Sequence, residues 1–80
     1  MSNVNFEDFA KEFAAELQIE DDNFIKTPLK DLKQYDSMGK ITASLVIESL
    51  FSFEIDLDIL DDVETLESLY QYCISKSKDN

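Results

Sequence analysis

Histidine and tryptophan are absent from this 80-residue chain, and glycine, proline and cysteine occur once each. Without histidine, neither a Ser-His-Asp triad nor a Cys-His pair can form, and zinc has no imidazole ligand. The single Cys73 cannot form a disulfide within the chain, so a reducing compartment, the cytoplasm, is expected. A chain this short also has little room for a deep cleft. We therefore expect neither an enzyme nor a metal site.

Basic residues are scarce as well, with 7 Lys and Arg against 18 Asp and Glu and a net charge of −11. This charge repels nucleic-acid phosphates and anionic lipids, and it speeds encounters with basic protein surfaces. No apolar run approaches the roughly 18 residues of a membrane-spanning helix. The opening "MSNVNFEDF" lacks the basic and apolar regions of a signal peptide. The expected molecule is a monomer whose partners are proteins with basic docking patches, with no nucleic acid and no stable membrane insertion.

Apolar residues are plentiful, at 44% of the chain with six Phe and three Tyr, so one domain spanning 1–80 can bury a thin core. In the first part, apolar residues recur at helical spacing from Phe6 to Leu17, and Asn5 is a good cap. This pattern predicts a helix over 5–17. Residues 18–36 then predict a long loop packed down by its own apolar side chains. Within it, Thr27-Pro28 is typical of a cap followed by the first residue of a short helix.

Three further helices are predicted, at 37–53, 56–61 and 65–76, the last capped by Thr65. The helix at 37–53 is apolar over much of its circumference, because Met38, Ile41 and Leu45 form a second line beside its main stripe. Such a helix is either central or shows apolar surface to a partner. The predicted fold is all-α, a small four-helix bundle of three main helices and one short helix. Its expected core contains Phe6, Phe9, Phe13, Ala43, Ile47, Leu50, Leu69 and Cys73.

The segment "YDSMGKITASLVIESLFSFEID" resembles the core of an acyl carrier protein. In that family an Asp-Ser-Leu or Asp-Ser-Met tripeptide opens the second helix, and its serine carries a 4′-phosphopantetheine arm derived from coenzyme A. The resemblance covers nearly the whole chain, since the order of helices and the long loop also agree. It implies that Ser37 carries the arm and that the arm's thiol holds acyl groups as thioesters. The implied partners are a phosphopantetheinyl transferase and acyl-transferring or acyl-activating enzymes of fatty-acid or specialised lipid and secondary biosynthesis.

The resemblance also implies roles for the neighbours of Ser37, each with a simpler structural alternative. Asp36 would be recognised by the transferase, and it is a good helix cap in any case. Met38 and Leu45 would contact partner enzymes, or they could pack at the edge of the core. Glu48 matches an acidic partner-contact position, although a solvated surface charge would look the same in sequence.

Two features depart from fatty-acid carriers. Their second helix is strongly acidic, whereas 37–53 contains only Lys40 and Glu48 as charged residues. Gly39 and Thr42 occupy positions that are often acidic, and Gly39 costs about 1 kcal/mol of helix stability unless it permits close approach of the arm or a partner. Because charge influences partner choice, these departures indicate a specialised carrier with a different set of enzymes.

Three alternatives remain open from the sequence. The same fold and serine would serve an aminoacyl or peptidyl carrier. Asp36-Ser37 could be only a cap, which would leave an unmodified acidic helical adaptor for basic proteins. The segment "DLDILDDVE" prompts a calcium site, but it lacks the glycine and the terminal Glu spacing of an EF-hand loop.

Overall fold

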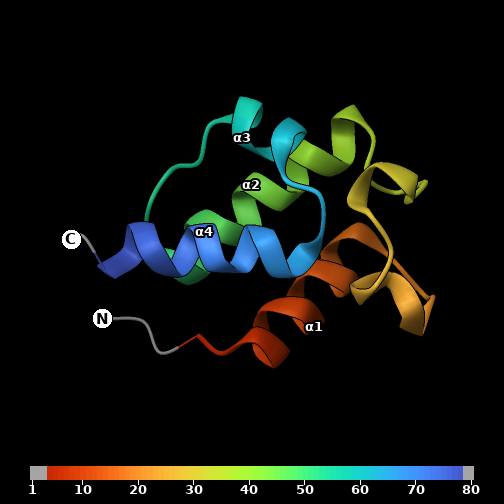
Figure 1. Ribbon diagram of the computed structural model, residues 1–80, viewed down its shortest axis with the longest axis horizontal. Helices are drawn as coiled ribbons and strands as arrows, with labels where there is room; N and C mark the ends of the chain where they lie inside the picture. The colour runs from red at the N-terminus through yellow and green to blue at the C-terminus, as the bar shows by residue number, and fades with distance from the viewer. Residues whose placement is uncertain (1–3, 79–80) are drawn as a thin grey trace.

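The main regular elements of residues 4–78, the part of the chain that the computed structural model describes, are four α-helices (Figure 1). They are α1 (Phe6–Leu17), α2 (Ser37–Phe51), α3 (Leu57–Asp62) and α4 (Leu66–Lys78). There is no strand in the described residues, and α3 has only 6 residues. The prediction of an all-α domain with three main helices and one short helix is confirmed. None of the helices described is both long enough and apolar enough to cross a membrane.

Side-chain caps fix where the three long helices begin. The side-chain oxygens of Asn5, Asp36 and Thr65 accept the backbone N–H three residues further on, at 2.7, 2.9 and 3.2 Å. Each cap satisfies a donor that has no partner within its own helix. The predicted starts therefore agree with the observed starts to within one residue.

The helix ends were harder to predict. The expected helix over 37–53 stops at Phe51, because Ser52 adopts a left-handed conformation with φ 63° and its N–H donates to the Glu48 carbonyl at 3.0 Å. Left-handed residues commonly terminate helices, but glycine is the usual choice, so a serine gave no signal. The short helix lies one residue later than predicted, and α4 runs to Lys78 instead of residue 76.

The connection between α1 and α2 is packed as expected, but it is not a plain loop. It contains two 3₁₀ helices, η1 (Asp22–Ile25) and η2 (Leu29–Asp31). Phe24 and Leu29 are buried, and the Leu29 N–H donates to the Glu64 carbonyl at 2.7 Å. That bond ties the connection to the segment that leads into α4.

The prediction at Thr27-Pro28 was wrong by one residue. Pro28 precedes η2 with an extended ψ of 136°, so it is not the first helical residue. The Thr27 hydroxyl does not cap η2 either, since it donates back to the Asn23 carbonyl at 3.0 Å. The local signal for a short helix was nevertheless correct.

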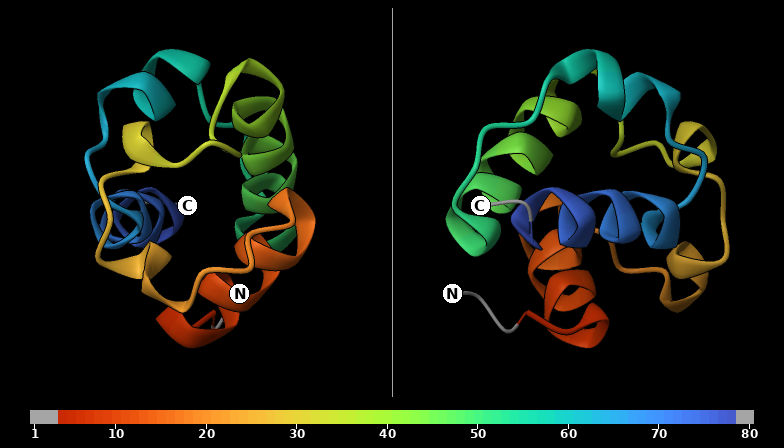
Figure 2. Two further views of the ribbon diagram at one scale, coloured as in Figure 1. Left: turned by 90° about the vertical axis from the view of Figure 1, so that its right-hand side faces the viewer. Right: turned by 60° about the vertical axis from the view of Figure 1, so that its left-hand side comes forward.

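Aromatic side chains fill the centre of the bundle. Phe9 lies 5.6 Å from Phe51 and 6.0 Å from Phe13, measured between ring centroids, and all three are buried. Six of the eight expected core residues are buried, whereas Phe6 and Leu50 are only half-buried. Buried residues of α4 belong to the same core. Figure 2 shows that α4 runs in a clearly different direction from α2.

Candidate functional site

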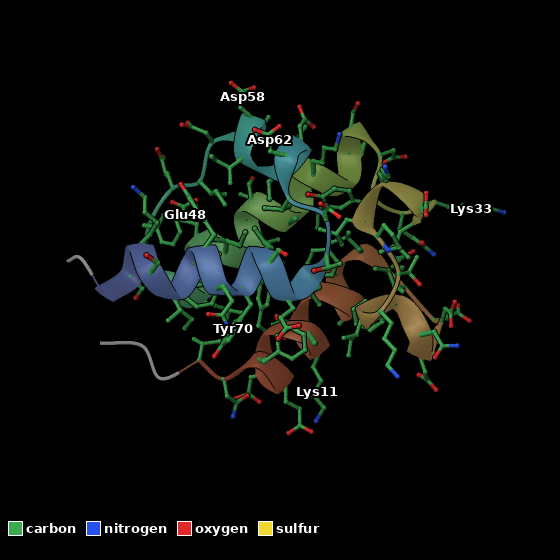
Figure 3. All side chains as sticks on the ribbon, viewed as in Figure 1. Lys11, Lys33, Glu48, Asp58, Asp62 and Tyr70 are labelled. Atoms are coloured by element: carbon green, nitrogen blue, oxygen red, sulfur yellow. The ribbon has the colours of Figure 1, made fainter. Side chains whose placement is uncertain are left out.

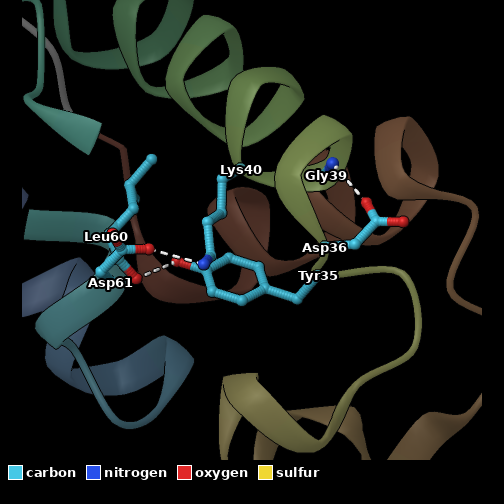
Figure 4. Close-up of polar contacts among 6 residues, drawn as sticks. All are labelled: Tyr35, Asp36, Gly39, Lys40, Leu60 and Asp61. Carbon is cyan, nitrogen blue, oxygen red and sulfur yellow. Dashed lines mark hydrogen bonds and ion pairs between the residues drawn. The ribbon is translucent and has the colours of Figure 1, made fainter. Parts of the chain in front are cut away.

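Asp36 and Ser37 stand where the chain leaves the long connection and enters α2. The Asp36 carboxylate accepts the Gly39 N–H at 2.9 Å (Figure 4). Ser37, the first residue of α2, is exposed, and its hydroxyl makes no hydrogen bond within the described residues. The first backbone N–H groups of a helix lack intrahelical partners and carry partial positive charge. The site thus offers an accessible hydroxyl at a place that favours an anion.

Gly39 lets the preceding loop pass unusually close to α2. A Cβ at this position would lie 1.8 Å from the Gln34 carbonyl oxygen and 2.9 Å from its carbon, closer than real Cβ atoms come. The sequence suggested that this glycine makes room for the arm or a partner. The neighbour is instead the chain's own backbone, and the close approach places the loop at Gln34 directly against the first turn of α2.

Tyr35 anchors the same turn from the other side. Its ring is buried beside Phe13, with centroids 6.3 Å apart, and its hydroxyl donates to the Leu60 carbonyl at 2.6 Å (Figure 4). Burial, and secondarily the charge of Asp61, raise the pKa of the Tyr35 phenol. The phenol therefore remains a protonated donor, and it links the residue before Asp36 to the end of α3.

Lys40 adds a second link to α3, this time from α2 itself. Its ammonium pairs with the Asp61 carboxylate at 2.5 Å and lies 5.7 Å from the centre of the Tyr35 ring (Figure 4). In the sequence, Lys40 is one of only two charges on this helix that were expected to influence partner choice. Its charge is instead engaged within the chain, so the first turns of α2 present little net charge to a partner.

The two apolar residues predicted as partner contacts are exposed. Met38 is 70% exposed and Leu45 is 60% exposed, with Ile41 at 44% on the same side of α2. Packing at the edge of the core, the alternative for both, is therefore not what the structure shows. Together with Leu57 of α3, at 47%, they are the only large apolar side chains exposed in the described residues. We call Met38, Ile41 and Leu45 the α2 stripe; it begins directly after Ser37.

No family model, curated protein or solved structure matches this chain.

Exposed carboxylates lie on both of the helices that carry exposed apolar side chains. Asp58 and Asp62 project outward from α3, and Glu48 is exposed further along α2 (Figure 3). Exposed apolar residues and exposed acids on the same helices suit a partner that has both apolar and basic side chains. Leu57 was missed as a site residue because in sequence it belongs to a short amphipathic turn, where an inward position is the simpler expectation.

Cys73 carries the chain's only thiol and lies on the inner face of α4. Its side chain is fully buried, and burial raises the pKa of the thiol to about 12. Thiolate is the nucleophilic form of cysteine, so this thiol is unreactive in the folded protein. Any thioester chemistry at the site would need a sulfur from elsewhere.

Proposed function

We propose that this protein is an acyl carrier whose Ser37 hydroxyl bears a 4′-phosphopantetheine arm. The observation that carries the proposal is the exposed Ser37 hydroxyl at the capped start of α2, directly followed by the α2 stripe. The order of helices and the Asp-Ser-Met sequence support it, because both resemble the acyl carrier family.

The residues at Ser37 suit such an arm. A phosphodiester on the hydroxyl would lie beside the backbone N–H groups of the first turn, where helix geometry favours negative charge. When bound, the arm supplies a flexible thiol for the thioester. Cys73 does not compete, since it is buried and protonated.

The neighbouring residues then take separate roles. Asp36 holds the helix start through its bond to the Gly39 N–H and presents its exposed carboxylate to a phosphopantetheinyl transferase. Met38 and Leu45 give an acyl-transferring or acyl-activating enzyme an apolar contact beside the arm. Glu48 is exposed on α2 and adds a negative charge that attracts basic docking patches.

The sparse charge on α2 supports a specialised lipid or secondary pathway over housekeeping fatty-acid synthesis. With Lys40 paired to Asp61, the first turns of the helix offer mainly apolar contacts. An aminoacyl or peptidyl carrier would use the same serine. Loading the thiol with activating enzymes for fatty acids and for amino acids, side by side, separates these two cargoes.

The intact mass of the protein tests the proposal, measured before and after incubation with coenzyme A and a broad-specificity phosphopantetheinyl transferase. We expect one added arm on the wild type and none on Ser37→Ala, with both proteins folded by circular dichroism. A folded wild type that gains no mass would make the unmodified acidic adaptor the better account.

A further inference from the structure

A groove of about 530 Å³ lies between α1 and residues 19–25, away from the start of α2. Its floor and walls are apolar on both sides. From α1 they include Phe6, Ala10 and Ala14, and from the following segment Ile19, Phe24 and Ile25. No residue of α2, α3 or α4 lines it.

The spacing of residues along α1 creates this groove. Phe9, Phe13 and Leu17 fill the core, while the line at four-residue steps from Phe6 faces the groove. Two of the three residues in that line are alanines, so the helix leaves space where larger side chains would close the gap.

The opposite wall is ordered. The Asp21 carboxylate accepts the Asn23 N–H at 2.9 Å, which caps η1. Phe24 stacks on Phe13 with ring planes 3° apart and centroids separated by 6.4 Å. The groove therefore exists before any partner arrives, and binding does not first have to order the wall.

The rim of the groove is acidic. Glu7, Asp21 and Asp22 are exposed around it, against the single cation of Lys11, which points away from the domain (Figure 3). The ion pair found in the described residues joins Lys40 to Asp61, so the rim carboxylates are not neutralised by the chain's own lysines. An apolar floor under a mainly acidic rim complements a surface with apolar and basic side chains.

We propose that this groove docks a basic amphipathic segment of a partner protein. Apolar side chains of the segment enter above Ala10 and Ala14, and its Lys or Arg side chains reach Glu7 and Asp22. Segments of this kind bind shallow grooves through one apolar face. A small molecule fits less well, because small-ligand sites enclose most of the ligand, whereas this groove is largely open to solvent.

The groove is separate from Ser37, and the proposal does not depend on the arm. In every view of Figures 1 and 2, α1 and residues 22–25 lie in the lower half, and the first turn of α2 lies in the upper half. A partner held in the groove thus leaves the start of α2 accessible to a second protein.

Binding of a fluorescein-labelled amphipathic peptide of leucine and lysine tests this docking site, with the corresponding leucine–glutamate peptide as a control. Fluorescence anisotropy gives the affinity, and amide chemical shifts in NMR spectra locate the peptide. We expect only the basic peptide to bind, and we expect its affinity to fall as salt is added. Its binding should change the amide chemical shifts of α1 and of residues 19–25. Shifts centred on the α2 stripe, or no binding of the basic peptide, would overturn the proposal.

Glu7→Lys and Glu67→Lys form a matched pair of variants. Both glutamates are exposed in the first turn of a helix, and both changes alter the net charge equally, but only Glu7 lines the groove. We expect about a fivefold weaker affinity for Glu7→Lys and less than about a twofold change for Glu67→Lys. Equal losses of affinity in the two variants would show that the peptide is attracted by the overall charge of the protein alone, and they would overturn the proposal.

Ala14→Leu tests the apolar floor without changing charge. Ala14 is half-buried and lines the groove, so the larger side chain should fill it and weaken the peptide about tenfold. Circular dichroism checks that the variant is folded. Unchanged affinity in the folded variant would show that the peptide does not use this floor.

Discussion

The start of α2 and the start of α4 share the same local chemistry and differ in what surrounds it. Each helix has an oxygen-bearing cap, Asp36 or Thr65, and an exposed serine in its first turn, Ser37 or Ser68. The Ser68 hydroxyl accepts a hydrogen bond from the Thr65 hydroxyl at 3.1 Å. The hydroxyl of Ser37 has no such bond within the described part of the chain.

The two helices also use their apolar residues in opposite ways. Along α4, Leu66, Leu69 and Cys73 are fully buried, so the helix serves the core. Along α2, Met38 and Leu45 are exposed beside Ser37. A capped serine is therefore a weak signal alone, and the exposed apolar surface beside Ser37 is the feature that separates the candidate site from the start of α4.

The largest expected effect concerns the thiol on α4. Because its pKa is raised to about 12, Cys73 should react with a disulfide reagent at pH 8 roughly 1000-fold more slowly in the native protein than after unfolding in guanidinium. Absorbance of the released thiol reagent gives both rates. Fast labelling of the native protein would mean that the Cys73 thiol on α4 is accessible and reactive, and it would contradict the contrast drawn with α2.

The same shift predicts a dependence on pH. The folded state keeps the Cys73 proton that the unfolded chain releases near its ordinary pKa, so the free energy of unfolding falls as pH rises from about 9 to about 12. Urea denaturation across this range measures the fall, and Cys73→Ala should lessen it. An identical fall in the variant would assign the effect to other groups.

Gly39→Ala and Ser68→Ala compare the third residue of α2 with that of α4. The new methyl group at residue 39 would meet the Gln34 carbonyl, and we expect the free energy of unfolding to drop by about 2–3 kcal/mol. This corresponds to roughly 10–20 °C in melting temperature for a domain of this size. Ser68→Ala, at an exposed position, should change stability by no more than about 0.5 kcal/mol. A stabilised Gly39→Ala would contradict the close loop contact.

Removal of either cap should cost similar stability and have different functional effects. We expect Asp36→Ala and Thr65→Ala each to lower the free energy of unfolding by about 1 kcal/mol. Asp36→Asn keeps an oxygen for the cap, so its stability should stay close to that of the wild type. Only the two changes at residue 36 should slow arm installation, measured by intact mass over time. Equal rates for Asp36→Asn and the wild type would leave Asp36 as a cap alone.

The smallest expected effect comes from the link between α2 and α3. Lys40 and Asp61 are partly exposed, at 29% and 54% of their side chains, so Lys40→Met should cost less than about 1 kcal/mol. Chemical denaturation at low and high salt measures the loss, which should shrink as salt is added. A larger loss that does not change with salt would assign Lys40 a packing role.

Short-range signals in the sequence predicted most of the fold. Cap residues and the helical period give the starts of α1, α2 and α4, because both signals lie within a few neighbouring residues. The stop at Ser52 was missed, since a left-handed serine is uncommon and leaves no mark in the sequence. The two 3₁₀ helices were blurred into one packed loop for a similar reason, as helices this short show no period.

The residues of the candidate site could be proposed from the sequence, but the contacts that hold them in place could not. The position of Ser37 follows from the cap at Asp36. The second apolar line was visible in the sequence, but its spacing left core packing and exposure open, and the structure shows that Met38 and Leu45 are exposed. The contact of Gly39 with Gln34 and the pairing of Lys40 with Asp61 depend on how the loop and α3 fold back onto α2. No local pattern encodes these approaches.

The most direct test of the central claim is to locate the arm among the serines by fragmentation mass spectrometry after transferase treatment of the wild type. The account predicts a single arm, found only on the peptide that contains Ser37, with Ser68 unmodified. An arm on Ser68, or one divided between the two helix starts, would contradict the claim that the surroundings of Ser37 make it the attachment site.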